Sequence, residues 1–170
     1  MSMLAAGGIE PLTDRRRQAD ENNPKGYYEF ERVKQLKTDT GWLPLAKGKA
    51  VKVISMLLEH LPPEHHYKVI FMERDMQEVL ASQMAMLQRD GKDGGSTTDE
   101  ILGEKFRLHL ERVRQWLARQ PNFDVLYIGY REVLKNRRRA AIHINRFLDN
   151  RLDVEQMYST VDQDLYRQRR

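Results

Sequence analysis

An arginine and a serine eight residues apart could together hold a phosphate. The apolar run 69–72 is followed by Glu73 and Arg74, and Ser82 lies on the helical pattern that comes next. The run predicts a buried parallel strand, and ligands of open α/β sheets bind where strands end and helices begin. Eight residues make about two helical turns, so both side chains could grip one phosphate from two sides. The alternative is that Arg74 pairs with Glu78 or Asp75 at the surface, while Ser82 faces a neighbouring helix.

Three segments resemble motifs of the sulfotransferase family, in the family's order and over nearly the whole chain. Residues 74–82, with an arginine, seven residues and a serine after a strand, resemble its 3′-phosphate-binding motif. Residues 124–134, DVLYIGYREVL, resemble its late strand with a Tyr-Glu-Asp-Leu ending, and residues 140–148, AAIHINRFL, resemble the helix after it. Residues 23–29, NPKGYYE, are similar to a segment of bacterial sulfotransferase-like proteins.

The resemblance implies a nucleotide cofactor. Sulfotransferases use 3′-phosphoadenosine 5′-phosphosulfate as sulfuryl donor and release adenosine 3′,5′-bisphosphate. Arg74, Ser82 and Tyr130 are therefore expected to bind the cofactor. Arg167 stands where the family brings basic residues back to the 3′-phosphate; alternatively, it belongs to a frayed basic tail.

The resemblance also suggests catalytic residues for transfer of a sulfuryl group to a hydroxyl or amine acceptor. Such transfer needs aligned reactants, neutralised charge and a general base. Lys52 matches the lysine of a Lys-Thr-His sequence in cytosolic sulfotransferases, but Ile54 occupies the position of the basic histidine. Other sulfotransferases use a glutamate, so Glu29 and Glu31 are candidate bases. Their alternative role is to complement the dipole at a solvated helix start. No His, Asp or Glu cluster has metal-ligand spacing, so no metal is assigned.

The glycine-rich loop that binds the donor's 5′-phosphosulfate in the family does not occur in this sequence. Such loops bring backbone N–H groups to a phosphate at the start of a helix. Residues 1–8 instead resemble the end of the helix after that loop, with glycine as its C-cap. The sequence thus resembles a sulfotransferase domain that begins one strand and one loop late, and we expect transfer to be impaired. The alternative is a degenerate nucleotide-binding or protein-interaction module. A phosphotransferase is disfavoured because a Walker lysine and magnesium ligands are absent.

Composition indicates a charged globular protein. The 170 residues carry a net charge of +4, which favours anionic ligands such as nucleotides. The arginine clusters lack interleaved aromatic residues, so no nucleic-acid partner is expected. No apolar run is long enough to cross a membrane, no signal peptide is evident and there is no cysteine. These features predict a cytoplasmic protein without a membrane partner.

Strand–helix alternation predicts one domain over residues 1–170, an α/β fold with three layers and a parallel sheet flanked by helices. By resemblance this is a P-loop-NTPase-like sulfotransferase fold, N-terminally truncated. The expected strands are residues 50–55, 68–72 and 125–128. The expected helices are residues 1–6, 28–37, 57–61, 75–89, a long helix capped by Thr97 or Thr98, 138–148 and 154–160, with a flexible connection at 90–96. A strand missing from the sheet would leave edges unpaired, so we expect association, with a homodimer as one form.

Overall fold

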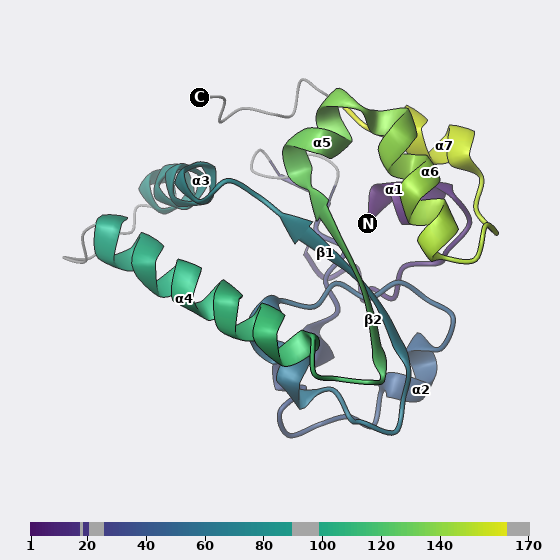
Figure 1. Cartoon of the computed structure of the whole chain (residues 1–170), viewed down its shortest axis with the longest axis horizontal. Helices are drawn as coiled ribbons and strands as arrows, with labels where there is room; N and C mark the ends of the chain where they lie inside the picture. Colours follow the sequence, from purple (N-terminus) through teal and green to yellow (C-terminus); the bar gives the residue numbers. More distant parts are fainter. Residues whose placement is uncertain (18, 21–25, 90–98, 163–170) are drawn as a thin grey trace.

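The computed structural model describes residues 1–17, 19–20, 26–89 and 99–162. It is an α/β structure, as predicted, and its described strands form a two-stranded parallel sheet (Figure 1). β1 (Tyr67–Glu73) pairs with β2 (Phe123–Gly129) along its whole length, from Tyr67 opposite Phe123 to Glu73 opposite Gly129. Parallel strands finish at the same edge of a sheet. The residues after Glu73 and after Gly129 are therefore brought to one edge.

Helices account for most of the remaining described residues. They are α1 (Ser2–Ala6), η1 (Glu31–Gln35), α2 (Leu43–Ala46), η2 (Ser55–His60), α3 (Met76–Arg89), α4 (Asp99–Leu117), α5 (Tyr130–Lys135), α6 (Arg137–Phe147) and α7 (Val154–Ser159), of which η1 and η2 are 3-10 helices. No helix of the described residues has the length and apolar character needed to span a membrane.

The sheet has helices on both faces because its strands carry apolar side chains at consecutive positions. Successive side chains point to opposite faces. Phe71 belongs to a core cluster with Leu117 of α4 and Leu58 of η2. Ile128 faces the other way, in a cluster with Ile144 of α6 that also includes residues of α1 and α7. Helix α3 begins at Met76, after Arg74 and Asp75, and α5 begins directly after β2, so both helices start near the carboxyl edge of the sheet (Figure 1).

Several local predictions are confirmed and others are wrong. The two strands at 68–72 and 125–128 form, as do the helices at 75–89, 138–148 and 154–160. The strand expected at 50–55 does not form: Ala50 makes only an isolated bridge with Pro11. An apolar run becomes a strand only where a neighbouring strand completes its ladder, and the described residues supply none beside it. Helix α5 was missed because its residues were assigned to the end of the late strand.

The glycine end predicted for α1 is present, and its two glycines have different roles. Gly8 has a φ of +105°, a left-handed conformation that favours glycine, whereas Gly7 has a φ of −76°, in the right-handed region. A Cβ at this position would lie 2.6 Å from Cγ of Met157. Glycine therefore allows α1 to pack closely against α7. The expected caps Thr97 and Thr98 and the connection at 90–96 lie outside the described residues.

Tyr67, the first residue of β1, makes the fold sensitive to high pH. Its hydroxyl donates to the carbonyl oxygen of Pro62 at 2.8 Å, and its ring centroid lies 4.8 Å from that of Phe123. Burial, helped by the charge of Glu64, raises the pKa of Tyr67 to about 12. An unfolded tyrosine ionises near pH 10. The unfolded state therefore binds fewer protons above about pH 10, and this stability is lost as the pH rises through about 12.

Urea unfolding of the wild type and of Tyr67→Phe, from about pH 9 to 12, measures this contribution. The wild type is expected to lose on the order of 1–2 kcal/mol more than the variant over that interval, after allowance for the partial exposure of the ring. Other tyrosines and lysines titrate in both proteins, so only the difference between the two curves counts. Parallel curves would show that Tyr67 ionises equally in the folded and unfolded states.

Candidate functional site

The carboxyl edge of the sheet brings Arg74 and Tyr130 together. Each is the first residue after the last paired position of its strand, where Glu73 lies opposite Gly129. The guanidinium carbon of Arg74 lies 4.9 Å from the centroid of the Tyr130 ring. This separation is within the range of a cation–π interaction. Two of the residues that the sequence assigns to the nucleotide are thus in contact.

Glu78 connects this pair to a second arginine. Its side chain is only 1% exposed, and its Oε1 accepts hydrogen bonds from Nε and Nη2 of Arg131 at 2.8 and 2.5 Å. Nε of Arg74 lies 3.7 Å from Oε2 of Glu78. Arg74 therefore does pair with Glu78, one of the alternatives raised by the sequence, but this carboxylate is buried rather than at the surface.

Asp75, the other acidic neighbour of Arg74, acts on the backbone instead. Its Oδ1 accepts hydrogen bonds from the backbone N–H groups of Gln77 and Glu78 at 2.9 and 3.3 Å. These two groups are among the N–H donors that the start of a helix leaves without intrahelical partners. Asp75 thus fixes the start of α3 and, with it, the position of Glu78.

Ser82 lies on α3 and is partly buried. No hydrogen bond joins its hydroxyl to another described residue. The structure therefore places Ser82 on the expected helix, two turns beyond Arg74, without showing a direct contact between the two. Arg167 lies outside the described residues, as do Asn23, Pro24 and Lys25 of the NPKGYYE segment.

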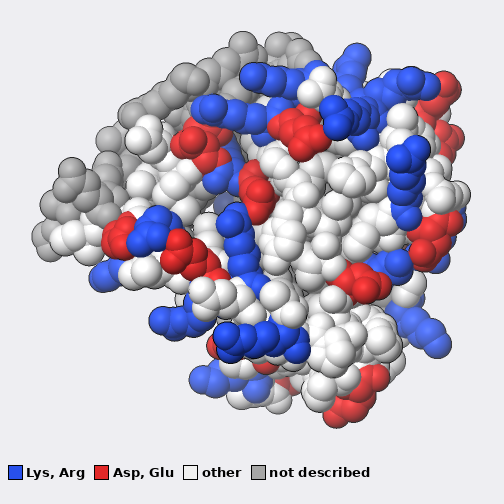
Figure 2. All heavy atoms as spheres, viewed as in Figure 1, with Lys and Arg blue, Asp and Glu red and all other residues white. Residues whose placement is uncertain are grey.

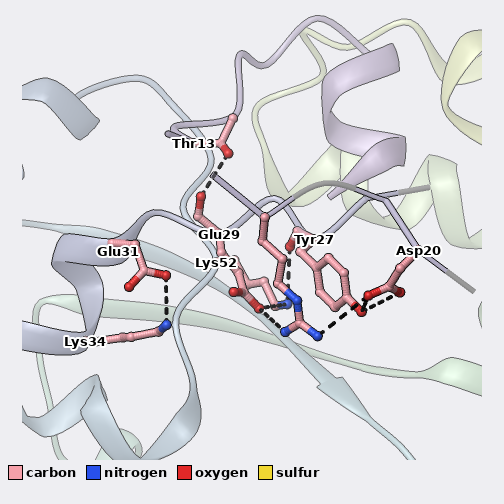
Figure 3. Close-up of polar contacts among 8 residues, drawn as sticks. Thr13, Asp20, Tyr27, Glu29, Glu31, Lys34 and Lys52 are labelled. Carbon is pink, nitrogen blue, oxygen red and sulfur yellow. Dashed lines mark hydrogen bonds and ion pairs between the residues drawn. The ribbon is translucent and has the colours of Figure 1, made fainter. Parts of the chain in front are cut away.

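Lys52 and Glu29 meet in a second cluster (Figure 3). Nζ of Lys52 lies 3.5 Å from Oε1 of Glu29 and donates a hydrogen bond to the carbonyl oxygen of Tyr27 at 3.2 Å. Arg17 approaches the same carboxylate oxygen at 3.8 Å, and its guanidinium carbon lies 3.5 Å from the centroid of the Tyr27 ring. Glu29 therefore lies between two cations.

Tyr27 is the buried member of this second cluster. Its hydroxyl donates to the two carboxylate oxygens of Asp20 at 2.7 and 2.8 Å (Figure 3). Burial, together with this hydrogen bond, raises the pKa of Tyr27. The phenol therefore stays neutral at physiological pH and acts as a donor that fixes Asp20.

An unusual backbone path presents Tyr27 and Glu29 to the cluster. Gly26 has a φ of +80° and Tyr28 a φ of +51°. Glycine adopts such values freely, whereas a bulky residue does so only where its surroundings impose them. Thr13 supplies part of that constraint, because its hydroxyl donates to the carbonyl oxygen of Glu29 at 2.8 Å.

Glu31, the other candidate base, has a structural environment instead. Its carboxylate pairs with Lys34 one turn later at 2.7 Å, in an exposed part of η1, and this hydrogen bond raises the pKa of Lys34. Its backbone N–H donates to Asp14 at 2.8 Å, which lowers the pKa of Asp14. Glu31 therefore matches the alternative expected of both glutamates, a solvated helix start, and Glu29 does not.

The two clusters remain separate in the described structure. No hydrogen bond or ion pair between described residues joins Lys52 or Glu29 to Arg74, Ser82 or Tyr130. Sequence reasoning missed Arg131 as a member of the carboxyl-edge cluster, and it expected Glu78 at the surface rather than buried. A signal for Arg131 was present, because it follows the end of a predicted strand just as Arg74 does.

A basic surface lies next to the carboxyl-edge cluster. Figure 2 shows Lys and Arg side chains gathered along the upper edge of the view, above α5 and α6. The residues around a shallow depression there are Lys135, Asn136, Arg137, Arg138, Arg139 and Ile142. Clustered cations raise the local concentration of anions, so this surface would favour the approach of an anionic ligand.

Among the described residues, no three His, Asp or Glu side chains are grouped as a metal would require.

Comparisons with known proteins identify no relative of this chain. No protein-family model matches the chain, and neither a curated protein nor a solved structure is significantly similar to it. The functional argument therefore rests on the residues and their arrangement.

Proposed function

We propose that this protein is a sulfotransferase-like domain, related to P-loop-NTPase folds, that binds the 3′-phosphoadenosine half of a sulfuryl donor. The observation that carries the proposal is the meeting of Arg74 and Tyr130 at the carboxyl ends of two adjacent parallel strands. Nucleotides bind at this edge of open α/β sheets. Arg74 supplies positive charge and hydrogen-bond donors, Tyr130 an aromatic ring, and Ser82 a hydroxyl two helical turns away.

Arg74 also has a donor whose acceptor a ligand would supply. Its Nε is buried and makes no hydrogen bond with a described residue, since the nearest oxygen of Glu78 is 3.7 Å away. Buried N–H groups without an acceptor are rare and costly in native proteins. A phosphate oxygen would satisfy this donor after a small rotation of the side chain, with a charge-assisted hydrogen bond.

The Lys52–Glu29 cluster is the proposed catalytic side of the site. In sulfuryl transfer, Glu29 would take the proton of the acceptor hydroxyl or amine while the acceptor atom bonds to sulfur. The bond between sulfur and the phosphate oxygen breaks, and adenosine 3′,5′-bisphosphate leaves. Lys52 would neutralise charge on the transferred group or the leaving phosphate. The alternative function is nucleotide binding without turnover. A radiolabelled-sulfate transfer assay over phenols, alcohols and amines separates the two.

Arg74→Ala is expected to weaken binding of adenosine 3′,5′-bisphosphate about 10- to 100-fold. This range corresponds to losing a partly desolvated, charge-assisted contact of about 1.5–3 kcal/mol. Isothermal titration calorimetry on wild type and variant measures the change. Arg107→Ala is the matched control, because Arg107 lies on the exposed face of α4 and pairs there with Glu104 and Glu111.

The proposal makes Arg74 specific among the arginines. Arg107→Ala should therefore bind as the wild type does. Equal affinities of the wild type and Arg74→Ala, or no binding by the wild type, would refute the proposal.

A further inference from the structure

We propose that Arg131 is a second anion-binding residue of the nucleotide site and that Glu78 is the positioning residue that holds it there. This inference rests on the proposed function, because it concerns the phosphate that Arg74 would bind. Arg131 is the second residue after β2 and lies in the first turn of α5. It therefore stands at the same carboxyl edge of the sheet as Arg74.

One buried carboxylate holds both arginines. Arg131 donates two hydrogen bonds to Oε1 of Glu78, at 2.8 and 2.5 Å, while Nε of Arg74 lies 3.7 Å from Oε2. The two guanidinium groups therefore lie against different oxygens of the same side chain. Glu78 itself is fixed, because it is 1% exposed and its backbone N–H is bonded to Asp75 at the start of α3.

Both arginines also remain accessible from outside. The side chain of Arg131 is 44% exposed and that of Arg74 is 31% exposed. A guanidinium bonded to a buried carboxylate is held in a fixed orientation, which lowers the entropy cost of binding a ligand. Two arginines and one carboxylate carry a net positive charge, which suits an anion.

The arrangement favours a terminal phosphate over a bridging one. A phosphomonoester has three terminal oxygens and close to two negative charges, so it can accept hydrogen bonds from two guanidinium groups at once. The 3′-phosphate of adenosine 3′,5′-bisphosphate is such a group. Arg131 is therefore expected to contribute to recognition of the 3′-phosphate rather than to binding of the nucleotide in general.

A purely structural role for the Glu78–Arg131 pair makes a different prediction. If the pair only joined α3 to α5, its loss would change stability but not ligand preference. The affinity of Glu78→Gln for the bisphosphate is a further test, because the direction of the change shows whether Glu78 positions Arg131. Removal of a negative charge from beside an anion site would by itself tighten binding. Loss of a positioning contact would weaken it, because Arg131 would no longer be held by a charge-assisted hydrogen bond.

Calorimetric titration of wild type, Arg131→Gln and Glu78→Gln with two probes tests the inference. The probes are adenosine 3′,5′-bisphosphate and adenosine 5′-monophosphate, which differ only in the 3′-phosphate. Both variants are expected to weaken bisphosphate binding about tenfold or more, and to leave monophosphate binding within about twofold of wild type. Arg112→Gln, an exposed arginine of α4, is the matched control and should change neither.

Each result decides the question. Wild-type affinity in Arg131→Gln, while Arg74→Ala weakens binding, would overturn this inference and leave the proposed function standing. Tighter bisphosphate binding by Glu78→Gln, or equal losses for both probes, would also overturn it. No binding by the wild type would refute the proposed function and this inference with it. Thermal unfolding checks that each variant folds. Arg131→Lys replaces Arg131→Gln if the latter does not fold, because it keeps a charge beside Glu78 but loses the paired donors.

Discussion

Replacement of Glu78 by alanine is expected to lower the free energy of unfolding by about 3–5 kcal/mol, the usual cost of removing one partner from a buried ion pair. The reason lies in the burial of the carboxylate, which is 1% exposed and accepts two hydrogen bonds from Arg131. Its loss removes the acceptor of the two Arg131 hydrogen bonds and the carboxylate beside the buried Nε of Arg74. The truncated side chain also leaves a cavity between α3 and α5.

Urea unfolding followed by circular dichroism measures this change. Glu104→Ala is the matched control: the same substitution in a helix, at a carboxylate 55% exposed and paired with Arg107 on the surface. Exposed pairs of this kind contribute little because water and salt screen them, so the control should unfold close to the wild type. Similar midpoints for Glu78→Ala and Glu104→Ala would mean that water replaces the buried pair at little cost.

Replacement of Trp42 by alanine is expected to destabilise the protein by about 3–5 kcal/mol, the range for deleting a large buried aromatic side chain. Trp42 is 1% exposed and packs in a separate small core with Val33 and Leu36. Its ring centroid lies 5.4 Å from that of Phe30 in an edge-on arrangement, and its indole N–H donates to the carbonyl oxygen of Asp39 at 3.1 Å. This core supports the segment that carries Glu29 and Lys52. We therefore expect the substitution to lower the free energy of unfolding and also to disturb the contact between Lys52 and Glu29.

Leu45→Ala is the control for Trp42→Ala, because Leu45 lies three residues further on and is 57% exposed. Its truncation removes little buried surface and should leave the urea midpoint nearly unchanged. Intrinsic fluorescence is unsuitable here, since the substitution removes one of only two tryptophans. Circular dichroism and a one-dimensional NMR spectrum measure the loss instead. Equal midpoints for the two variants would show that the small core does not contribute to the cooperative unfolding of the domain.

Local sequence patterns predicted the elements around the carboxyl edge well. The apolar runs that end at Met72 and Ile128 formed the paired strands, and the 3.6-residue periodicity after Arg74 formed α3. These predictions succeed because a strand or helix that buries apolar side chains shows its own periodicity in the chain. The same patterns placed Arg74 at a strand end, whereas Tyr130 was assigned by resemblance. Two parallel strands bring such ends together whatever their separation in sequence.

The strand predicted at 50–55 shows where local patterns fail. Within it only Ala50 reaches a partner, Pro11, and Ser55 already belongs to η2. Hydrogen bonds in a sheet join different segments, so no single run can specify that it will be paired. The helices expected at 28–37 and 57–61 form with other bounds, as the 3-10 helices Glu31–Gln35 and Ser55–His60. Both are short, and packing against neighbours decides the conformation of so short a segment.

By itself, the sequence determined where the two strands lie, to within about two residues at each end, and how much positive charge the chain carries. Only the tertiary structure decided that Glu78 is buried, that it bonds Arg131 rather than lying at the surface with Arg74 alone, and that Lys52 reaches Glu29. The physical reason is the range of the interactions. Periodicity acts within one element, whereas a buried carboxylate acquires its partner only when strand register sets two distant helix starts side by side.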